Sequence, residues 1–181
     1  NIYILNLFAT SIKYKLYWYS IISMHNNTNI YMEFVMKPLF VIFTVLLIQS
    51  DLYGANHSVK MLNQGPSGVM VFEPAFLKIN IGDSVTFEST DAAHNSASIP
   101  GMIPSSASTW SGGLSQNITV MFDVAGIYGY QCTPHSMMAM VGVIQVGDDK
   151  SNLDSVKAVA QQYKSSFVMN QSRLDDLLSK I

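Results

Sequence analysis

The stretch that decides the fold reads Cys132-Thr133-Pro134-His135-Ser136-Met137-Met138-Ala139-Met140. A strand pattern over residues 127–131 comes directly before it, and Cys132 continues the inward-facing side of that pattern. Pro134 ends the strand, because proline cannot donate a hydrogen bond to a sheet. A further strand pattern begins at Met140. We therefore expect Cys132 to point inward at the end of a β-structure, with His135 in the loop beyond it and Met140 facing back across that loop.

A histidine in another loop can complete a metal site with these residues. His94 can approach the same point from the side, so that one thiolate, two imidazoles and one thioether converge. A His₂Cys trigonal site with a long axial Met is the blue-copper arrangement, whereas zinc gains little from a thioether. A single buried Cys is usually a small hydrophobe. The copper prediction therefore rests on the whole pattern, Cys-x₂-His-x₄-Met with an upstream His94-Asn95 pair.

The remaining residues between 56 and 147 follow the period of two that is typical of strands. Short strands at this spacing predict an all-β protein, an antiparallel sandwich or barrel. The segment 99–116 is rich in Ser, Gly and Pro and is expected to be a loop. Two amphipathic helices are expected at 151–163 and 170–181, with Ser151 and Asn152 as candidate caps of the first. The expected strands are 58–63, 69–73, 76–80, 84–88, 117–122, 127–131 and 140–146.

Charge is distributed unevenly along the 181 residues, of which only 12% are charged, against about 25% in an average domain. We interpret residues 1–31 as an upstream extension outside the native protein and 32–55 as a signal peptide. The apolar run 38–48 is short of the roughly 20 residues that a membrane span needs, so we expect no span in the mature form; an uncleaved N-terminal anchor is the alternative. Residues 56–147 then form the domain, and 148–181 form a helical extension packed on it.

Composition also excludes several functions. A net charge of -2 gives no basic excess for binding nucleic acid. One cysteine excludes a disulfide framework within the chain and a Cys-rich zinc or iron–sulfur site. A multicopper enzyme needs several more histidines than the domain offers, so no enzymatic activity is expected.

The domain resembles the pseudoazurin family of small cupredoxins, from about Val59 to the C-terminus. The 38 residues from His94 to Cys132 and the two C-terminal helices also resemble that family. The matching stretches are Met61-Leu62-Asn63, Met70-Val71-Phe72-Glu73-Pro74-Ala75, Gly82-Asp83-Ser84-Val85-Thr86-Phe87, His94-Asn95, Met102-Ile103-Pro104, Cys132-Thr133-Pro134-His135 and Val146-Gly147-Asp148.

This resemblance implies an eight-stranded Greek-key sandwich that holds one type 1 copper and shuttles electrons in the periplasm. It implies His94, Cys132, His135 and Met140 as the copper ligands. Met138 competes as the axial ligand, because the related amicyanins place their Met three residues after the His. The interval from His to Cys and the helical tail favour Met140. The resemblance further suggests that Asn95 bonds across to the Cys132 loop and that backbone N–H groups approach the Cys132 sulfur.

The sequence departs from this family in its charge. Lysines are common in the family at the positions of Gln64, Ala92 and Gln131, and the loop 99–116 has no charge at all. We therefore expect a monomer that docks redox partner proteins through an apolar patch around His135, with weak dependence on salt. The candidate patch residues are Pro134, Met137, Met138, Met102, Ile103 and Pro104.

The alternative function is copper handling, as a chaperone or storage protein, and the Met cluster gives it some support. A chain cut after Gly54 would begin Ala55-Asn56-His57, which can bind Cu(II) through backbone nitrogens. A handling site would exchange its metal readily.

Overall fold

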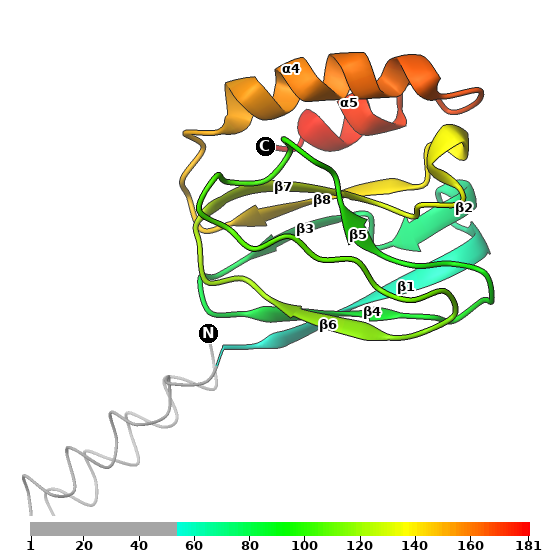
Figure 1. The fold of residues 1–181 in the computed structure, drawn as a ribbon, viewed down its shortest axis with the longest axis horizontal. Helices are drawn as coiled ribbons and strands as arrows, with labels where there is room; N and C mark the ends of the chain where they lie inside the picture. Colours follow the sequence, from blue (N-terminus) through cyan, green and yellow to red (C-terminus); the bar gives the residue numbers. More distant parts are fainter. Residues whose placement is uncertain (1–53) are drawn as a thin grey trace, which may run out of the picture. The chain divides into compact units, whose positions relative to one another are not determined.

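This computed structural model describes residues 54–181, which form two four-stranded sheets followed by two helices (Figure 1). The strand orders are β2-β1-β4-β6 and β3-β8-β7-β5. The expected extension at 1–31 and nearly all of the expected signal peptide at 32–55 lie outside the described residues. The strands are β1 (Asn56–Gly65), β2 (Gly68–Glu73), β3 (Phe76–Ile79), β4 (Ser84–Glu88), β5 (Ala97–Ser98), β6 (Ile118–Met121), β7 (Gly126–Gln131) and β8 (Val141–Val146).

Alternation along the strands sends one face of each sheet into a shared core. In β4, Val85 and Phe87 are fully buried, whereas the residues between them reach the surface in part. Aromatic rings dominate this core; Tyr130 packs edge-on against Phe72 and Phe87, with ring centroids 4.8 and 5.0 Å apart. Cys132 belongs to the same buried cluster, which confirms that it points inward.

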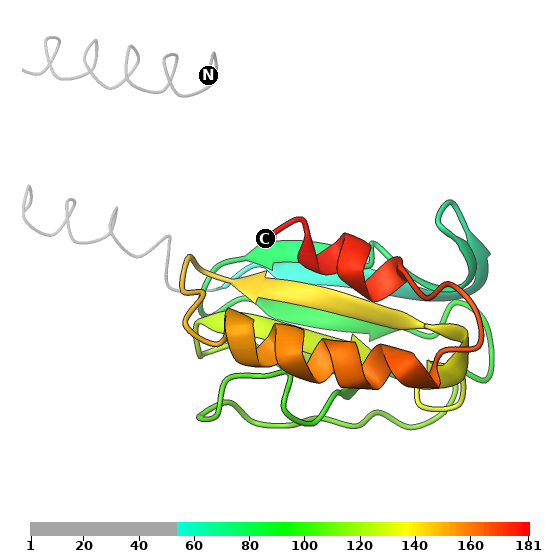
Figure 2. The ribbon, with the colours of Figure 1, turned by 90° about the horizontal axis from the view of Figure 1, so that it is seen from above.

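Helices α4 (Leu153–Tyr163) and α5 (Arg173–Leu178) cover the outer face of the β3-β8-β7-β5 sheet (Figure 2). The apolar positions expected from helical spacing are buried there: Val156 and Ala160 on α4, and Leu174, Leu177 and Leu178 on α5. All six residues of β8 are buried, because its two faces meet the core and the helices. Within residues 54–181 no helix has the length and apolarity to cross a membrane.

Three details differ from the sequence expectations. The sandwich is not purely antiparallel, because β1 pairs with β4 and β3 pairs with β8 in parallel; a period of two does not encode strand direction. The two-residue strand β5 is not among the expected strands, because it is too short to show any period. The Asn152 side chain does not cap α4: its amide accepts from the Ile127 N–H and donates to the Ile127 carbonyl, at 2.9 and 2.8 Å. It thereby attaches the start of α4 to β7.

Candidate metal centre

Cys132 follows the last residue of β7, so its position is set by the sheet. Its backbone N–H donates to the carbonyl of Met140 (2.9 Å), immediately before β8 begins. The loop between them contains the short 3₁₀ helix η3 (Ser136–Met138) and returns through Ala139, whose φ of 57° is left-handed. The hydrogen bond closes the base of this loop, and the thiol lies inside the sandwich with no exposed surface.

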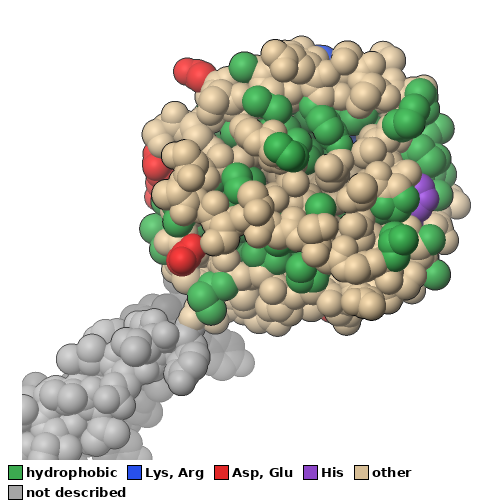
Figure 3. Space-filling model, in the orientation of Figure 1, with side chains coloured by type: hydrophobic (Ala, Val, Ile, Leu, Met, Phe, Trp, Pro, Cys, Tyr) green, Lys and Arg blue, Asp and Glu red, His purple; other side chains and the backbone are tan. Residues whose placement is uncertain are grey.

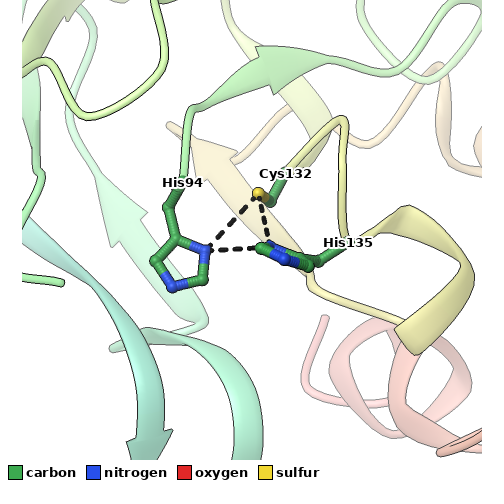
Figure 4. A group of neighbouring side chains, drawn as sticks. All are labelled: His94, Cys132 and His135. Atoms are coloured by element: carbon green, nitrogen blue, oxygen red, sulfur yellow. Dashed lines mark hydrogen bonds between the residues drawn. The ribbon is translucent and has the colours of Figure 1, made fainter. Parts of the chain in front are cut away.

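His94 and His135 bring their Nδ1 atoms to the Cys132 sulfur from two different loops (Figure 4). The sulfur lies 3.7 Å from Nδ1 of His94 and 3.5 Å from Nδ1 of His135, and the two nitrogens are 3.1 Å apart. From these separations, the point equidistant from the three atoms lies about 2.0 Å from each, close to the 2.0–2.3 Å of metal bonds to imidazole and thiolate. The three donors therefore fit a single transition-metal ion.

Asn63 sets the tautomer of His94. Its side-chain oxygen lies 3.0 Å from Nε2 of His94 and can only accept, so Nε2 carries the proton and Nδ1 keeps its lone pair toward the sulfur. The sequence pattern does not point to this role of Asn63. No local signal connects two residues that are 31 positions apart, and only the pairing of their strands and loops brings them together.

Asn95 ties the His94 loop to the Cys132 loop, as expected. Its side-chain oxygen accepts from the Thr133 N–H (2.8 Å), and its nitrogen donates to the Thr133 hydroxyl (3.2 Å). The same nitrogen donates to the carbonyl of Gly112 (3.1 Å). One buried amide thus joins three segments around the site.

The surroundings act on the protonation of the donors. Burial raises the pKa of the Cys132 thiol, and the nearby backbone N–H groups of Asn95 and His135 act in the opposite direction. Burial lowers the pKa of His94, and the neighbouring His135 lowers it further. The site thereby favours the neutral imidazole, which is the form that binds a metal.

The two candidate axial residues differ in burial. Met140 has no exposed surface and lies in the same buried cluster as Cys132. Met138 lies on η3, is partly exposed and is not part of either buried cluster of the described chain. Burial beside the thiol favours Met140.

Only some of the residues expected to form an apolar patch around His135 lie at the surface beside it. Pro134 and Met137 are exposed, and His135 and Met138 are partly exposed. Three members of the expected patch are misplaced. Met102 is completely buried under the helices, and Pro104 is buried against Gly126, the first residue of β7.

The loop that carries Met102 and Pro104 therefore runs along β7 toward the end of the strand that is opposite Cys132. Ile103, in the same loop, is partly buried against the core. An apolar sequence does not reveal which end of a strand its loop covers. Val168, which was not among the expected patch residues, does lie beside Met137, because its N–H donates to the Met137 carbonyl (2.8 Å). Figure 3 shows hydrophobic side chains around the histidine that reaches this end of the surface, and few charges on the face drawn.

Comparison with known proteins identifies the family. The family of copper binding proteins named plastocyanin/azurin matches residues 59–147. A pseudoazurin of Methylorubrum extorquens is 44% identical over 124 residues, covering 68% of this chain and 80% of the relative. A pseudoazurin of Paracoccus pantotrophus is 36% identical over 137 residues, covering 76% and 91%. The crystal structure of the Methylobacterium extorquens pseudoazurin superposes with a TM-score of 0.61 at 41% identity, covering 69% of this chain and 98% of the other.

The donor set and the family agree on the metal. Two imidazoles, one thiolate and a buried thioether suit copper, and the family binds copper. Cupredoxins of this kind carry electrons and are not enzymes. The identity to these pseudoazurins over most of their length, and the eight-stranded sandwich with two C-terminal helices, together show that this chain belongs to the pseudoazurin family of copper-binding, electron-carrying cupredoxins.

Proposed function

We propose that this protein is a periplasmic carrier of single electrons whose copper is bound by His94, Cys132, His135 and, axially, Met140. The observation that carries the proposal is the convergence of Nδ1 of His94, Sγ of Cys132 and Nδ1 of His135 within 4.8 Å of one another. Copper bound among them supplies a couple between Cu(II) and Cu(I).

Rigid donors suit this role, because an electron moves fastest when its site changes shape little. Asn63 holds the His94 ring through Nε2, and Asn95 holds the two loops together. The Met140 carbonyl holds the Cys132 backbone. Each of these contacts joins two protein groups and leaves the metal-facing atoms of the donors free, so together they restrict movement of the donors.

His135 offers the route for the electron. His94 and Cys132 are fully buried, whereas the His135 ring reaches the surface in part. An electron that enters or leaves over the His135 edge crosses the least protein.

The partner surface follows from the residues around that edge. Pro134, Met137 and Val168 are exposed there, and Met137 and Val168 expose 56% and 67% of their surface. None of the three carries charge. We expect a monomer that docks redox proteins by apolar contact, with weak electrostatic steering.

The export part of the proposal rests on the sequence. The Lys37 charge, the apolar run 38–48 and the small residues Gly54-Ala55 follow the layout of a signal peptide. Fractionation of cells that express the full chain tests it: the mature protein is expected in the periplasmic fraction, and retention of the uncleaved chain in the membrane fraction would favour the anchor instead.

Titration of the purified protein with Cu(II) tests the copper site. An intense band near 600 nm, of the kind thiolate-to-copper charge transfer produces in blue-copper proteins, is expected at one copper per chain. Cys132→Ser is expected to abolish the band while leaving the fold, because the change is small. A colourless copper complex of the unmodified protein would contradict the proposal.

Copper handling is distinguished by metal exchange. A handling site is expected to lose copper rapidly to a chelator, whereas a carrier retains it. An Ala55-Asn56-His57 copper site would have to break the hydrogen bond from Ala55 N to Asp83 (2.7 Å), and Asp83 also holds the His57 ring through Nε2 (3.0 Å). Slow exchange is therefore expected, with one copper bound and not two.

A further inference from the structure

We propose that Arg173, far from the metal donors in sequence, is a positioning residue that holds the loop segment carrying Met140. It is the only arginine of the chain, and it is the first residue of α5. The proposal deepens the copper assignment and rests on it only where copper is used as the probe.

The Arg173 guanidinium donates to backbone carbonyls from two separate segments. Nη1 donates to Met70 (2.8 Å) and Ala139 (2.9 Å). Nη2 donates to Val69 (3.2 Å) and, at the long end, Ser67 (3.4 Å). None of the salt bridges within residues 54–181 includes Arg173. The cation therefore donates to the backbone of β2, of the turn before it and of the ligand loop.

The Ala139 carbonyl belongs to the peptide that leads into Met140. The other end of this peptide, the Met140 N–H, donates to the carbonyl of His135 (3.3 Å). The next carbonyl, that of Met140, accepts from the Cys132 N–H (2.9 Å). Arg173 thus holds one side of a peptide whose other side bonds His135, and the next peptide bonds Cys132.

The two residues nearest Nη1 also need external support. Ala139 and Met70 both have positive φ, 57° and 49°, although neither is glycine. A left-handed conformation is unfavourable for residues with a Cβ. A donor that binds both carbonyls favours this conformation over the extended alternative, so Arg173 stabilises two left-handed residues at once, Met70 within β2 and Ala139 in the ligand loop.

An arginine suits this task better than a lysine. The planar guanidinium presents donors along two edges and can reach carbonyls on both sides. A lysine ammonium is a point charge on a flexible stem, and it can satisfy one side at a time. Arg173→Lys is therefore expected to rescue the contact only in part.

Amide hydrogen exchange in the metal-free protein tests the positioning directly. Arg173→Ala is expected to speed exchange at the Met140 and Cys132 amides by about tenfold or more, because local opening of the loop becomes easier. The exchange rates of Arg173→Lys at these two amides are expected to lie between those of the unmodified protein and those of Arg173→Ala. The matched control is Lys164→Ala, which removes another cation of the C-terminal segment and its ion pair with Asp175 (2.6 Å), and leaves the loop alone.

The visible spectrum of the copper-loaded proteins is the second readout. Arg173→Ala and Arg173→Lys are expected to change the relative intensities of the charge-transfer bands, because the axial thioether is less well placed, whereas Lys164→Ala is not. Unchanged exchange and an unchanged spectrum in a folded Arg173→Lys or Arg173→Ala protein would overturn the proposal. If the unmodified protein forms no blue complex, the copper assignment fails, and the exchange measurement still decides the role of Arg173.

Discussion

Asn95 and Thr133 are joined by two hydrogen bonds, from the Thr133 N–H to the Asn95 oxygen (2.8 Å) and from the Asn95 nitrogen to the Thr133 hydroxyl (3.2 Å). Each of them directly follows a candidate ligand, His94 or Cys132. The pair therefore sets the distance between two donors that come from loops 38 residues apart.

Asn95→Ala is expected to weaken copper binding by about 10- to 100-fold, the usual cost of losing a residue that orients ligands. It is also expected to lower the free energy of unfolding of the metal-free protein by about 1–3 kcal/mol, because buried groups lose their partners. Chelator competition and denaturant unfolding measure the two effects. Asn152→Ala is the control, since it too removes a side-chain amide that bonds the backbone, here through two hydrogen bonds to Ile127 at the far end of β7. Equal loss of copper affinity in both variants would contradict a specific role for Asn95.

Met140→Leu tests the axial ligand, because leucine keeps the volume of the buried side chain and removes the sulfur. We expect the visible spectrum and the reduction potential to change in this variant and to remain nearly unchanged in Met138→Leu. Spectroscopy and voltammetry of the copper-loaded proteins measure this. The reverse result would assign the axial position to Met138.

Tyr130→Phe is expected to leave stability unchanged or to raise it by about 1 kcal/mol. The Tyr130 hydroxyl is buried and has no hydrogen-bond partner among residues 54–181, so its removal relieves an unsatisfied group. Tyr128→Phe is the control, because it loses a hydrogen bond to the Val124 carbonyl (2.7 Å). Its free energy of unfolding is expected to fall by about 1 kcal/mol. Thermal unfolding of both variants measures the difference. A larger loss in Tyr130→Phe than in Tyr128→Phe would show that the Tyr130 hydroxyl has a partner.

Asp83→Asn is expected to lower stability at neutral pH by about 1–3 kcal/mol. The buried carboxylate bonds His57, the Asn80 N–H and the Ala55 N–H, and the His57 bond is the main reason why the pKa of Asp83 lies below its ordinary 3.8. A lowered pKa stabilises the fold above that ordinary value, and the contribution disappears as the pH falls through the lower folded value.

Denaturant unfolding between pH 7 and pH 2 measures this dependence. The difference in the free energy of unfolding between the unmodified protein and Asp83→Asn is expected to be constant at higher pH and to disappear below about pH 3.8. Asp148→Asn, at an exposed ion pair with Lys78, is expected to show little effect at any pH. If this difference in the free energy of unfolding increased on acidification, the stabilising role of the Asp83 carboxylate would be refuted.

Electron self-exchange between oxidised and reduced copies tests docking by apolar contact. The rate is expected to change by less than about twofold between low and high ionic strength, because little charge surrounds His135. Met137→Lys adds a charge to the patch and is expected to slow exchange at low salt, with recovery at high salt. A steep salt dependence in the unmodified protein would rule out the apolar docking surface.

The sequence alone determined the class of fold and most of the chemistry. Alternation along β4, the helical spacing of Leu174, Leu177 and Leu178, and the Cys-x₂-His-x₄-Met pattern all reflect local geometry. Periodicity depends on neighbouring positions of one chain segment, so it can be recognised before any tertiary contact is known.

The tertiary structure alone decided how distant segments meet. The parallel pairing of β1 with β4, the hydrogen bond from His94 to Asn63, and the contact of Arg173 with Ala139 each join residues that share no local pattern. The burial of Met102 away from His135 was decided in the same way. A side chain's neighbours across a sandwich depend on strand order and loop path, and these follow from the packing of the whole core and not from the residues on either side of it.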